Sequence, residues 1–250
     1  MPKDPINYYR QEDVIQQYEK KFTSPGGSLV NQIEIETIAS LLNGQTGLCL
    51  DIGVGTGRMV PPLSSQGLKV IGLDISKGML RIAKSKGIPV VYGDARRIPF
   101  KDETFDVAIA SRVLIHLSDP ACYREASRVL RKSGTFVFDT LNKKSLRWLY
   151  AFLSNRIVSH NLESEAKTLQ KLAEAGFSFE KKIYRFFLPQ LFYSKSGGMV
   201  LEMVNKIDKF ILRSRLKYLA GSIFWKAKKS RGNSRITAHI WNIINAVRLP

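Results

Sequence analysis

The chain has 250 residues, of which 44% are hydrophobic and 24% charged, a balance that is ordinary for a soluble globular protein. This length allows one large domain with a full core, and the two cysteines, Cys49 and Cys122, form neither a metal-binding spacing nor a disulfide framework. The polar N-terminus lacks a secretory signal, and no run approaches the roughly 18 uncharged apolar residues that span a bilayer. We therefore expect a cytoplasmic protein that is not integral to a membrane.

Positive charge is concentrated in the second part of the chain. Lys and Arg outnumber Asp and Glu by 39 to 21, which gives a formal net charge of +18. Residues 1–140 carry 18 basic and 15 acidic side chains, a net of +3, whereas residues 141–250 carry 21 and 6, a net of +15. Such asymmetry is typical of proteins that contact an anionic surface, either nucleic acid or phospholipid. A solvated lysine coat or a basic proteome is the alternative explanation.

Residues 1–44 are predicted to be mainly helical and to precede the main domain. Apolar residues recur at helical spacing over residues 13–22 and again over 28–42. The run Thr-Ser-Pro-Gly-Gly at 23–27 is predicted to break the helix between these two stretches.

The stretch 48–58, LCLDIGVGTGR, joins a short apolar run to a glycine-rich turn. Three glycines follow Asp51 at alternate positions: Gly53, Gly55 and Gly57. This pattern is typical of a buried parallel strand that ends at a ligand-binding loop, where glycine lets the backbone turn tightly against a ligand. The third glycine comes one position too early for the dinucleotide fingerprint, and the phosphate-cradling GxxxxGK[ST] pattern is absent from the sequence.

Strands and helices are predicted to alternate as far as residue 139. The helix after the glycine turn should begin late or bend, because Pro61 and Pro62 disfavour a helix interior. Further helices are predicted from the N-cap Ser76 to Lys86, and from Pro120, as first helical residue, to 132–134. The strands are predicted at 68–73, 88–92, 105–110 and 135–139. This alternation predicts a parallel sheet with right-handed crossovers.

The last part of the chain is predicted to add one helix and an antiparallel pair of strands. The helix spans about 162–175, and the strands span 177–187 and 222–228. A helical insertion at about 188–221 separates the strands and contains one long basic amphipathic helix near 199–219. The main domain thus covers 45–230, and residues 231–250 form a basic tail that includes a short helix.

Four features fall at the carboxyl ends of successive predicted strands, where open α/β sheets bind ligands. The glycine turn is the first. Asp74 lies 21 residues beyond Gly53, the distance at which an acidic residue can accept hydrogen bonds from both ribose hydroxyls. Asp94 with Ala95 suits an adenine, because a carboxylate accepts from the exocyclic amine while a backbone N–H donates to a ring nitrogen. Residues 111–114 would border the far end of such a ligand.

The motifs LDIGVGTGR, GLDIS, GDARRIPFKDETFDVAIAS and VLIHLSDP followed by VLRKSG resemble the class I S-adenosylmethionine-dependent methyltransferases. The resemblance covers about 48–139 and is strongest to the methyltransferase type 11 subgroup, which includes quinone-biosynthesis methyltransferases. It implies a Rossmann-like α/β fold of seven strands with helices on both faces, S-adenosylmethionine as cofactor and S-adenosylhomocysteine as product. Val54 and Ile115 depart from the family pattern, the second where relatives often carry a histidine beside His116.

The resemblance also implies a role for each matching residue. The glycines of the turn would contact the cofactor through their backbone, and Asp51 would support the turn and the amino-acid end. The remaining cofactor residues would be Asp74 at the ribose, Ile75, Asp94 and Ala95 at the adenine, Ser111 at the methionine end, and Met79. Residues 1–44 would form a lid that carries an aromatic residue: Tyr18, with Tyr8 and Tyr9 as alternatives. Arg112 would lie on the substrate side.

The reaction implied is in-line displacement at the sulfonium methyl group. Because this methyl is already activated, the enzyme supplies orientation and desolvation, and a base is required only if the acceptor must lose a proton. His116 follows the fourth predicted strand and titrates near neutrality, so it is the candidate base, with a structural or substrate-lining role as the alternative. No metal site is expected.

The sequence leaves three classes of methyl acceptor or role open. A small or lipid-like acceptor, such as a prenylated quinone precursor, is favoured by aromatic residues beside a basic insertion that could lie on an anionic membrane surface. These aromatic residues are Trp148, Tyr150, Phe152, Phe186, Phe187, Phe192 and Tyr193. RNA is the second, lower-ranked class, because the chain has a basic second half but no recognisable RNA-binding module. A non-catalytic S-adenosylmethionine-binding module is the third.

Overall fold

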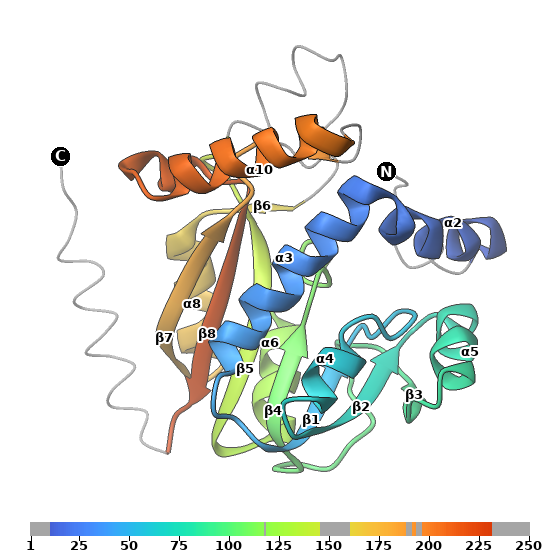
Figure 1. The fold of residues 1–250 in the computed structure, drawn as a ribbon. Helices are drawn as coiled ribbons and strands as arrows, with labels where there is room; N and C mark the ends of the chain where they lie inside the picture. The colour runs from blue at the N-terminus through green and yellow to red at the C-terminus, as the bar shows by residue number, and fades with distance from the viewer. Residues whose placement is uncertain (1–10, 118, 146–160, 189–191, 194–196, 232–250) are drawn as a thin grey trace, which may run out of the picture.

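The computed structural model describes residues 11–117, 119–145, 161–188, 192–193 and 197–231 (Figure 1). One sheet forms its centre, with strands in the order β3-β2-β1-β4-β5-β8-β7. In chain order the strands are β1 (Gly47–Ile52), β2 (Leu68–Asp74), β3 (Val90–Tyr92), β4 (Phe105–Ala110), β5 (Leu130–Asn142), β6 (Leu162–Glu163), β7 (Phe177–Arg185) and β8 (Ser222–Lys229). Strands β1 to β5 are parallel, and β8 runs antiparallel between β5 and β7. The predicted seven-stranded α/β fold is confirmed, and the two-residue β6 is added beside β5.

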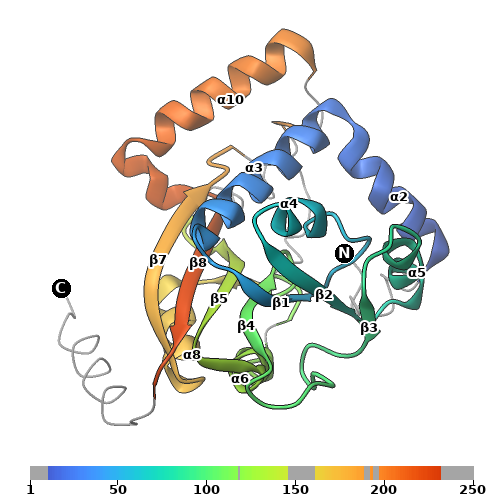
Figure 2. The same cartoon turned by 60° about the horizontal axis from the view of Figure 1, so that its bottom comes forward.

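Helices cover both faces of this sheet (Figure 2). The helices are α2 (Glu12–Thr23), α3 (Pro25–Leu42), α4 (Val60–Ser64), α5 (Lys77–Ser85), α6 (Ala121–Val129), α8 (Glu165–Glu174), α10 (Gly198–Leu212) and the 3-10 helix η1 (Arg215–Leu219). Helices α3, α4 and α5 share one hydrophobic core with the sheet, and α6 and α8 share another. Alternate residues of β1 divide between them: Cys49 packs in the first core, whereas Leu50 and Ile52 pack in the second.

The N-terminal helices are separated by one residue rather than by the predicted break at 23–27. Ser24 caps α3, because its side-chain oxygen accepts a hydrogen bond from the Gly27 N–H at 3.1 Å. Pro25 occupies the first turn of α3, where its missing N–H costs nothing, so the two glycines continue the helix. The predicted break was therefore too long.

Other boundaries differ for tertiary reasons. Helix α4 begins late, as Pro61 and Pro62 predict. Pro120 is the residue before α6, not its first, and α6 ends at Val129 because Leu130 already pairs with β4. The predicted helix at 162–175 was too long at its start, since residues 162–163 pair with β5 and the helix begins only after the N-cap Ser164.

The insertion between β7 and β8 contains α10 followed by η1, not the single helix predicted over 199–219. Arg213 and Ser214 separate them, and the Ser214 side chain caps η1 by accepting from the Leu216 N–H at 3.1 Å. Among the described residues, none of the helices has the length and apolar character that a bilayer crossing requires. Trp148, Tyr150, Phe152, Tyr8, Tyr9 and the predicted tail helix lie outside the described residues.

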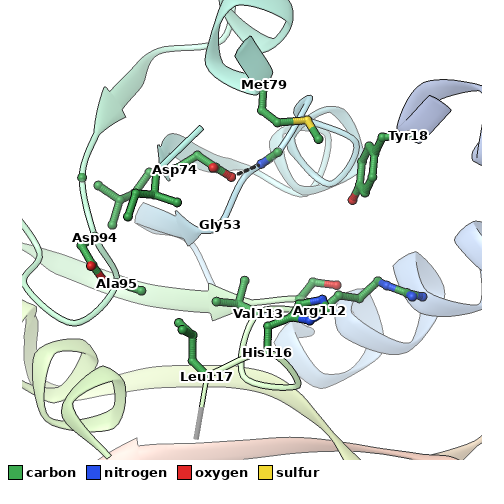
Figure 3. A pocket seen from close by; sticks show the side chains of 15 residues that line it. Tyr18, Gly53, Asp74, Met79, Asp94, Ala95, Arg112, Val113, His116 and Leu117 are labelled. Atoms are coloured by element: carbon green, nitrogen blue, oxygen red, sulfur yellow. Dashed lines mark hydrogen bonds between the residues drawn. The ribbon is translucent and has the colours of Figure 1, made fainter. Parts of the chain in front are cut away.

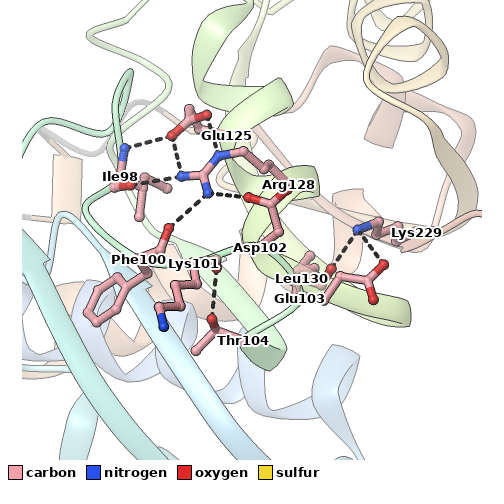
Figure 4. A network of polar contacts seen from close by, with 10 residues as sticks. All are labelled: Ile98, Phe100, Lys101, Asp102, Glu103, Thr104, Glu125, Arg128, Leu130 and Lys229. Carbon is pink, nitrogen blue, oxygen red and sulfur yellow. Dashed lines mark hydrogen bonds and ion pairs between the residues drawn. The ribbon is translucent and has the colours of Figure 1, made fainter.

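Arg128 of α6 anchors the segment that joins β3 to β4 (Figure 4). Its guanidinium donates to the carbonyl oxygens of Ile98 and Phe100, both at 2.8 Å, and pairs with Asp102 at 2.7 Å. Glu125 binds the same guanidinium at 2.8 Å and accepts from the Ile98 N–H at 2.7 Å. These contacts hold the far end of the loop that leaves β3, and so help to fix the strand end where a ligand is predicted to bind.

Candidate active site

A cavity opens at the carboxyl ends of β1 to β4 (Figure 3). It encloses about 880 Å³ of space, a figure that includes open solvent at its mouth. Its lining residues are Tyr18, Gly53, Gly55, Leu73, Asp74, Ile75, Met79, Gly93, Asp94, Ala95, Ser111, Arg112, Val113, His116 and Leu117. Residues from four strand ends and from α2 thus surround one space, as the sequence predicted from their register.

Some predictions do not coincide with this lining. Asp51 and Gly57 were predicted to contact a ligand, but neither lines the cavity. Val113 lines the cavity and lies within the predicted stretch 111–114, whereas Leu73, Gly93 and Leu117 line it and were not predicted as site residues. Leu73 and Leu117 resemble any core residue in the sequence, so nothing in their type marked them.

The glycine turn is built for close packing as well as for a ligand. Gly53 has φ +74°, and a Cβ there would lie 2.2 Å from the side chain of Val113. Gly57 has φ +86°, and a Cβ there would lie 2.2 Å from Ile88. Gly57 is therefore favoured by its left-handed backbone and by its close approach to Ile88, which lies between α5 and β3, whereas Gly53 lets the chain after β4 approach the turn.

Asp74 is fixed by the backbone on both sides. Its Oδ2 accepts from the Gly55 N–H and its Oδ1 from the Ser76 N–H, each at 2.8 Å. Burial raises the pKa of Asp74, although these backbone N–H groups oppose the shift. Each carboxylate oxygen has two lone pairs, so the held carboxylate can still accept bonds from a vicinal diol.

Asp94 lies on the cavity wall with Ala95, but it already has a partner. The guanidinium of Arg96 binds its carboxylate, with Nη2 2.6 Å from Oδ2. This bond from Arg96 is the main cause that lowers the pKa of Asp94. An adenine amine would therefore share the carboxylate with Arg96, which the four lone-pair positions of a carboxylate permit.

Asp51 is a buried carboxylate with an unsatisfied oxygen. It is 2% exposed, and its Oδ2 has no hydrogen-bond partner among the described residues. Burial raises the pKa of Asp51 to about 7, with Arg58 opposing the shift and Asp74 adding to it. Such an orphaned carboxylate, two residues before the glycine turn, fits a ligand that brings a cationic group to the turn.

We expect Asp51→Asn to stabilise the unliganded protein at pH 8 and to weaken cofactor binding. Between the ordinary carboxyl pKa and about 7, folded Asp51 holds a proton that the unfolded chain releases, so its contribution to stability falls as pH rises through this range. Removing the buried charge should raise the free energy of unfolding at pH 8 by about 1–2 kcal/mol, which would raise Tm by roughly 2–8 °C. Thermal melting across pH checks this.

The control for Asp51→Asn is Asp106→Asn. Burial acts to raise the pKa of Asp106, but the Leu48 N–H and Arg131 overcome it and hold that pKa below its usual range. Removing this charge should therefore not stabilise the protein at any pH. Equal melting temperatures for wild type and Asp51→Asn at pH 8 would contradict the role given to burial at Asp51.

A buried ion-pair network lies beside the cavity, and its acidic member was not predicted. Glu34 of α3 is 2% exposed and pairs with Arg58 and Arg112, each at 2.9 Å. Burial acts to raise the pKa of Glu34, but the two guanidinium groups outweigh it and lower that pKa. Arg58 also donates to Asn31 at 2.8 Å and to Ser111 at 3.0 Å. The network joins α3, the glycine turn and the chain after β4.

Arg112 is held in an unusual conformation at the cavity wall. Its φ is +61°, the left-handed region that a side chain other than glycine rarely adopts. Its backbone N–H donates to Asp139 Oδ1 at 2.6 Å, so the end of β5 fixes this turn. Burial, reinforced by the charge of Glu34, raises the pKa of Asp139 to about 6. Backbone strain of this kind is concentrated at functional sites.

Helix α2 closes one side of the cavity, with Tyr18 facing inward (Figure 3). Tyr18 makes an edge contact with Phe22, with ring centroids 5.1 Å apart, and the guanidinium of Arg58 lies over the Phe22 ring at 5.0 Å. Glu19 pairs with Lys86 at 3.1 Å, and Lys86 also donates to the Thr56 carbonyl at 3.0 Å. The predicted lid helix is thus attached to both the glycine turn and the segment after α5.

Comparison with known proteins is consistent with this arrangement. Residues 50–138 match the family model described as a methyltransferase domain. An uncharacterized protein of Methanocaldococcus jannaschii is 32% identical over 72% of this chain and 75% of its own length. A demethylmenaquinone methyltransferase of Corynebacterium kroppenstedtii is 40% identical over 34% of this chain and 38% of its own. The solved magnesium protoporphyrin IX methyltransferase of Synechocystis PCC 6803, with bound S-adenosylhomocysteine, has TM-score 0.63 and 15% identity over 90% of this chain and 97% of its own.

The fold and the cavity define an α/β protein with a ligand site at the carboxyl ends of its parallel strands. The chain belongs to the class I S-adenosylmethionine-dependent methyltransferase family, and S-adenosylmethionine is its cofactor. The residues present fit this cofactor: a glycine turn, a fixed carboxylate at Asp74 and an orphaned carboxylate at Asp51. The roles of the single residues remain predictions.

Proposed function

We propose that this methyltransferase acts on a small or lipid-like acceptor. The observation that carries the proposal is the lining of the cavity beyond the glycine turn and Asp74. Val113, His116 and Leu117 line the cavity from the chain after β4, and Tyr18 lines it from α2, so apolar and aromatic groups face part of its space (Figure 3). Relatives of this chain include enzymes named for quinone and porphyrin substrates, which are flat and largely apolar.

The residues of this chain orient the reactants and exclude water. When bound, S-adenosylmethionine supplies an activated methyl group for in-line displacement. Asp74 and the glycine turn would hold the cofactor in one position, and Tyr18 on α2 would cover it. Val113 and Leu117 would hold the acceptor in an apolar surrounding. Proximity of this kind contributes up to about 7–11 kcal/mol to lowering a barrier.

The experiment uses methyl-labelled S-adenosylmethionine and fractionated cell extract. The full-length protein is incubated with the lipid, RNA and protein fractions separately, and the label recovered in each is counted. We expect label in the organic-solvent-extractable fraction, insensitive to ribonuclease and protease. The Asp74→Asn variant serves as the blank, because it keeps the same surface and basic charge.

Two outcomes would overturn the proposal. Label in the RNA fraction would favour the second candidate, for which the net charge of +15 over residues 141–250 is the supporting observation. Binding of S-adenosylmethionine without transfer to any fraction would favour a non-catalytic binding module.

We expect His116→Gln to slow methyl transfer by about 10²-fold while leaving cofactor affinity unchanged. His116 lines the cavity in the chain after β4, apart from Asp74 and the glycine turn (Figure 3). A base would also impose a pH dependence near neutrality, which the glutamine variant should lose. Initial rates of label transfer across pH measure both effects. A slower rate with the same pH profile would indicate a lining role, and an unchanged rate would exclude either role.

A further inference from the structure

Helix α10 exposes a continuous apolar ridge. Met199, Met203, Ile207 and Phe210 recur at intervals of four, four and three residues, which places them on one face of the helix. They are 85%, 56%, 43% and 75% exposed, and Val200 beside them is also exposed. We call these five residues the α10 ridge. Scattered exposed apolar residues are ordinary, but a row on one helix face marks an interaction site.

The opposite face of α10 attaches the helix to the domain. Leu201 and Val204 are buried in the core that contains α3. Asp208 is buried as well and accepts from the Leu188 N–H at 2.9 Å. The helix therefore has a definite orientation, and the ridge is the face that it presents outward.

Basic side chains lie along one flank of the ridge. At about 100° of rotation per residue, Lys206, Lys209 and Arg213 follow each other on the same side of the ridge, and all three are exposed. Within the described part of the chain, no acidic side chain forms an ion pair with them. Glu202 is the acidic residue on this flank. An apolar face with a basic flank is the composition of helices that lie in the interface of an anionic membrane.

The sheet topology places this helix at the edge where the cavity opens. Strands β5 and β7 both pair antiparallel with β8, so β7 is parallel to β5 and to the cofactor-side strands. The carboxyl end of β7, where the insertion begins, therefore lies at the same edge of the sheet as the carboxyl ends of β1 to β4. In Figure 1, α10 crosses the top of the molecule, the end toward which β4 points.

We propose that the α10 ridge and its basic flank dock on the surface of an anionic phospholipid bilayer. Charge complementarity selects this occupant, because a second copy of the chain would bring another basic flank, from a protein of net charge +18, against the first. An RNA partner would use the basic side chains but would leave Met203 and Phe210 against solvated phosphate. Docking does not depend on the acceptor; delivery of a lipid-like acceptor from the bilayer to the cavity rests on the proposed function.

The test is flotation of the full chain with vesicles of phosphatidylcholine, with and without phosphatidylserine, at low and high salt. We expect binding only to vesicles that contain phosphatidylserine, weakened by salt. Two variants test the two parts of the surface: the ridge variant is Met203→Ser/Phe210→Ser, and the flank variant is Lys206→Gln/Lys209→Gln/Arg213→Gln. Each variant should reduce vesicle binding by at least about 10-fold. For the flank variant the reason is that each basic residue near an anionic surface raises the binding constant by about 5-fold. All substituted side chains are exposed, and melting curves and S-adenosylhomocysteine binding confirm folding.

The matched control removes the same charge elsewhere. Lys69, Lys84 and Lys132 are exposed residues outside the insertion, so their triple glutamine variant should retain most of the binding. Equal loss in this control, full binding by the ridge variant, or no flotation at low salt would overturn the proposal. So would a dimer in solution that the ridge variant dissociates, or tRNA binding that depends on the flank alone. Flotation without label in the lipid fraction would overturn the proposed acceptor but leave the docking standing.

Discussion

Replacement of Asp74 by Asn is expected to weaken binding of S-adenosylmethionine by about 10²–10⁴-fold. The carboxylate is predicted to accept two hydrogen bonds from the ribose, and bonds to a charged group are worth about 1.5–3 kcal/mol each. The amide also replaces one of the two oxygens that accept from the Gly55 and Ser76 N–H groups, so the turn loses part of its support. Isothermal titration calorimetry measures the affinity.

Asp119→Asn is the matched control for this variant. Asp119 Oδ1 accepts a hydrogen bond from the N–H of Ala121, two residues later, at 2.8 Å, and Asp74 Oδ1 accepts from the Ser76 N–H in the same way. Asp119 does not line the cavity. The Asp119→Asn protein should therefore bind the cofactor with the affinity of the wild type. A folded Asp74→Asn protein whose affinity lies within about threefold of wild type would contradict the ribose assignment, since that is under 1 kcal/mol.

Replacement of Glu34 by Gln is expected to destabilise the protein by about 3–5 kcal/mol. The change removes the counter-charge that Arg58 and Arg112 share, and breaking a buried ion pair is costly. At roughly 2–4 °C per kcal/mol, Tm should fall by about 6–20 °C. Because folding holds the Glu34 pKa below its usual range, its contribution is present above the ordinary carboxyl pKa and is lost as pH falls through the lowered value. Thermal melting at neutral pH measures the loss of stability in the variant. Melting at acidic pH shows whether the difference between variant and wild type disappears.

The control for this variant lies on the same helix. Glu36 is exposed and accepts from Gln32 at 2.8 Å, so Glu36→Gln should change stability by less than about 0.5 kcal/mol. If Glu34→Gln and Glu36→Gln had the same Tm, the ion-pair network would not contribute to stability as described.

Much of the fold could be predicted because local signals agree with the tertiary structure. The glycines after β1, the N-cap Ser76 and the prolines at 61 and 62 each determine a turn or a boundary through the residue itself. Where boundaries were wrong, a distant partner decided them. Strand β5 begins as early as Leu130 because Leu130 pairs with Phe105 of β4. Leu162 belongs to strand β6 because it pairs with Leu141 of β5.

The cavity was predictable in part for the same reason. Asp74, Asp94 and the glycine turn are brought together by parallel strands, whose carboxyl ends meet at one edge. The ion-pair network was not predictable, because Glu34 is one of two acidic residues on α3 and nothing local shows that two arginines reach it. The resemblance to the methyltransferases implied that Gly57 contacts the cofactor, but only the position of Ile88 reveals its packing role.

A crystal structure with S-adenosylhomocysteine bound tests the central claim most directly. We predict the ligand in the cavity at the strand ends, with both ribose hydroxyls hydrogen-bonded to Asp74 and the adenine between Ile75 and the Asp94–Ala95 backbone. The amino-acid end should reach past the glycine turn toward Asp51. A nucleoside bound elsewhere, or an Asp74 carboxylate that turns away from it, would contradict this account.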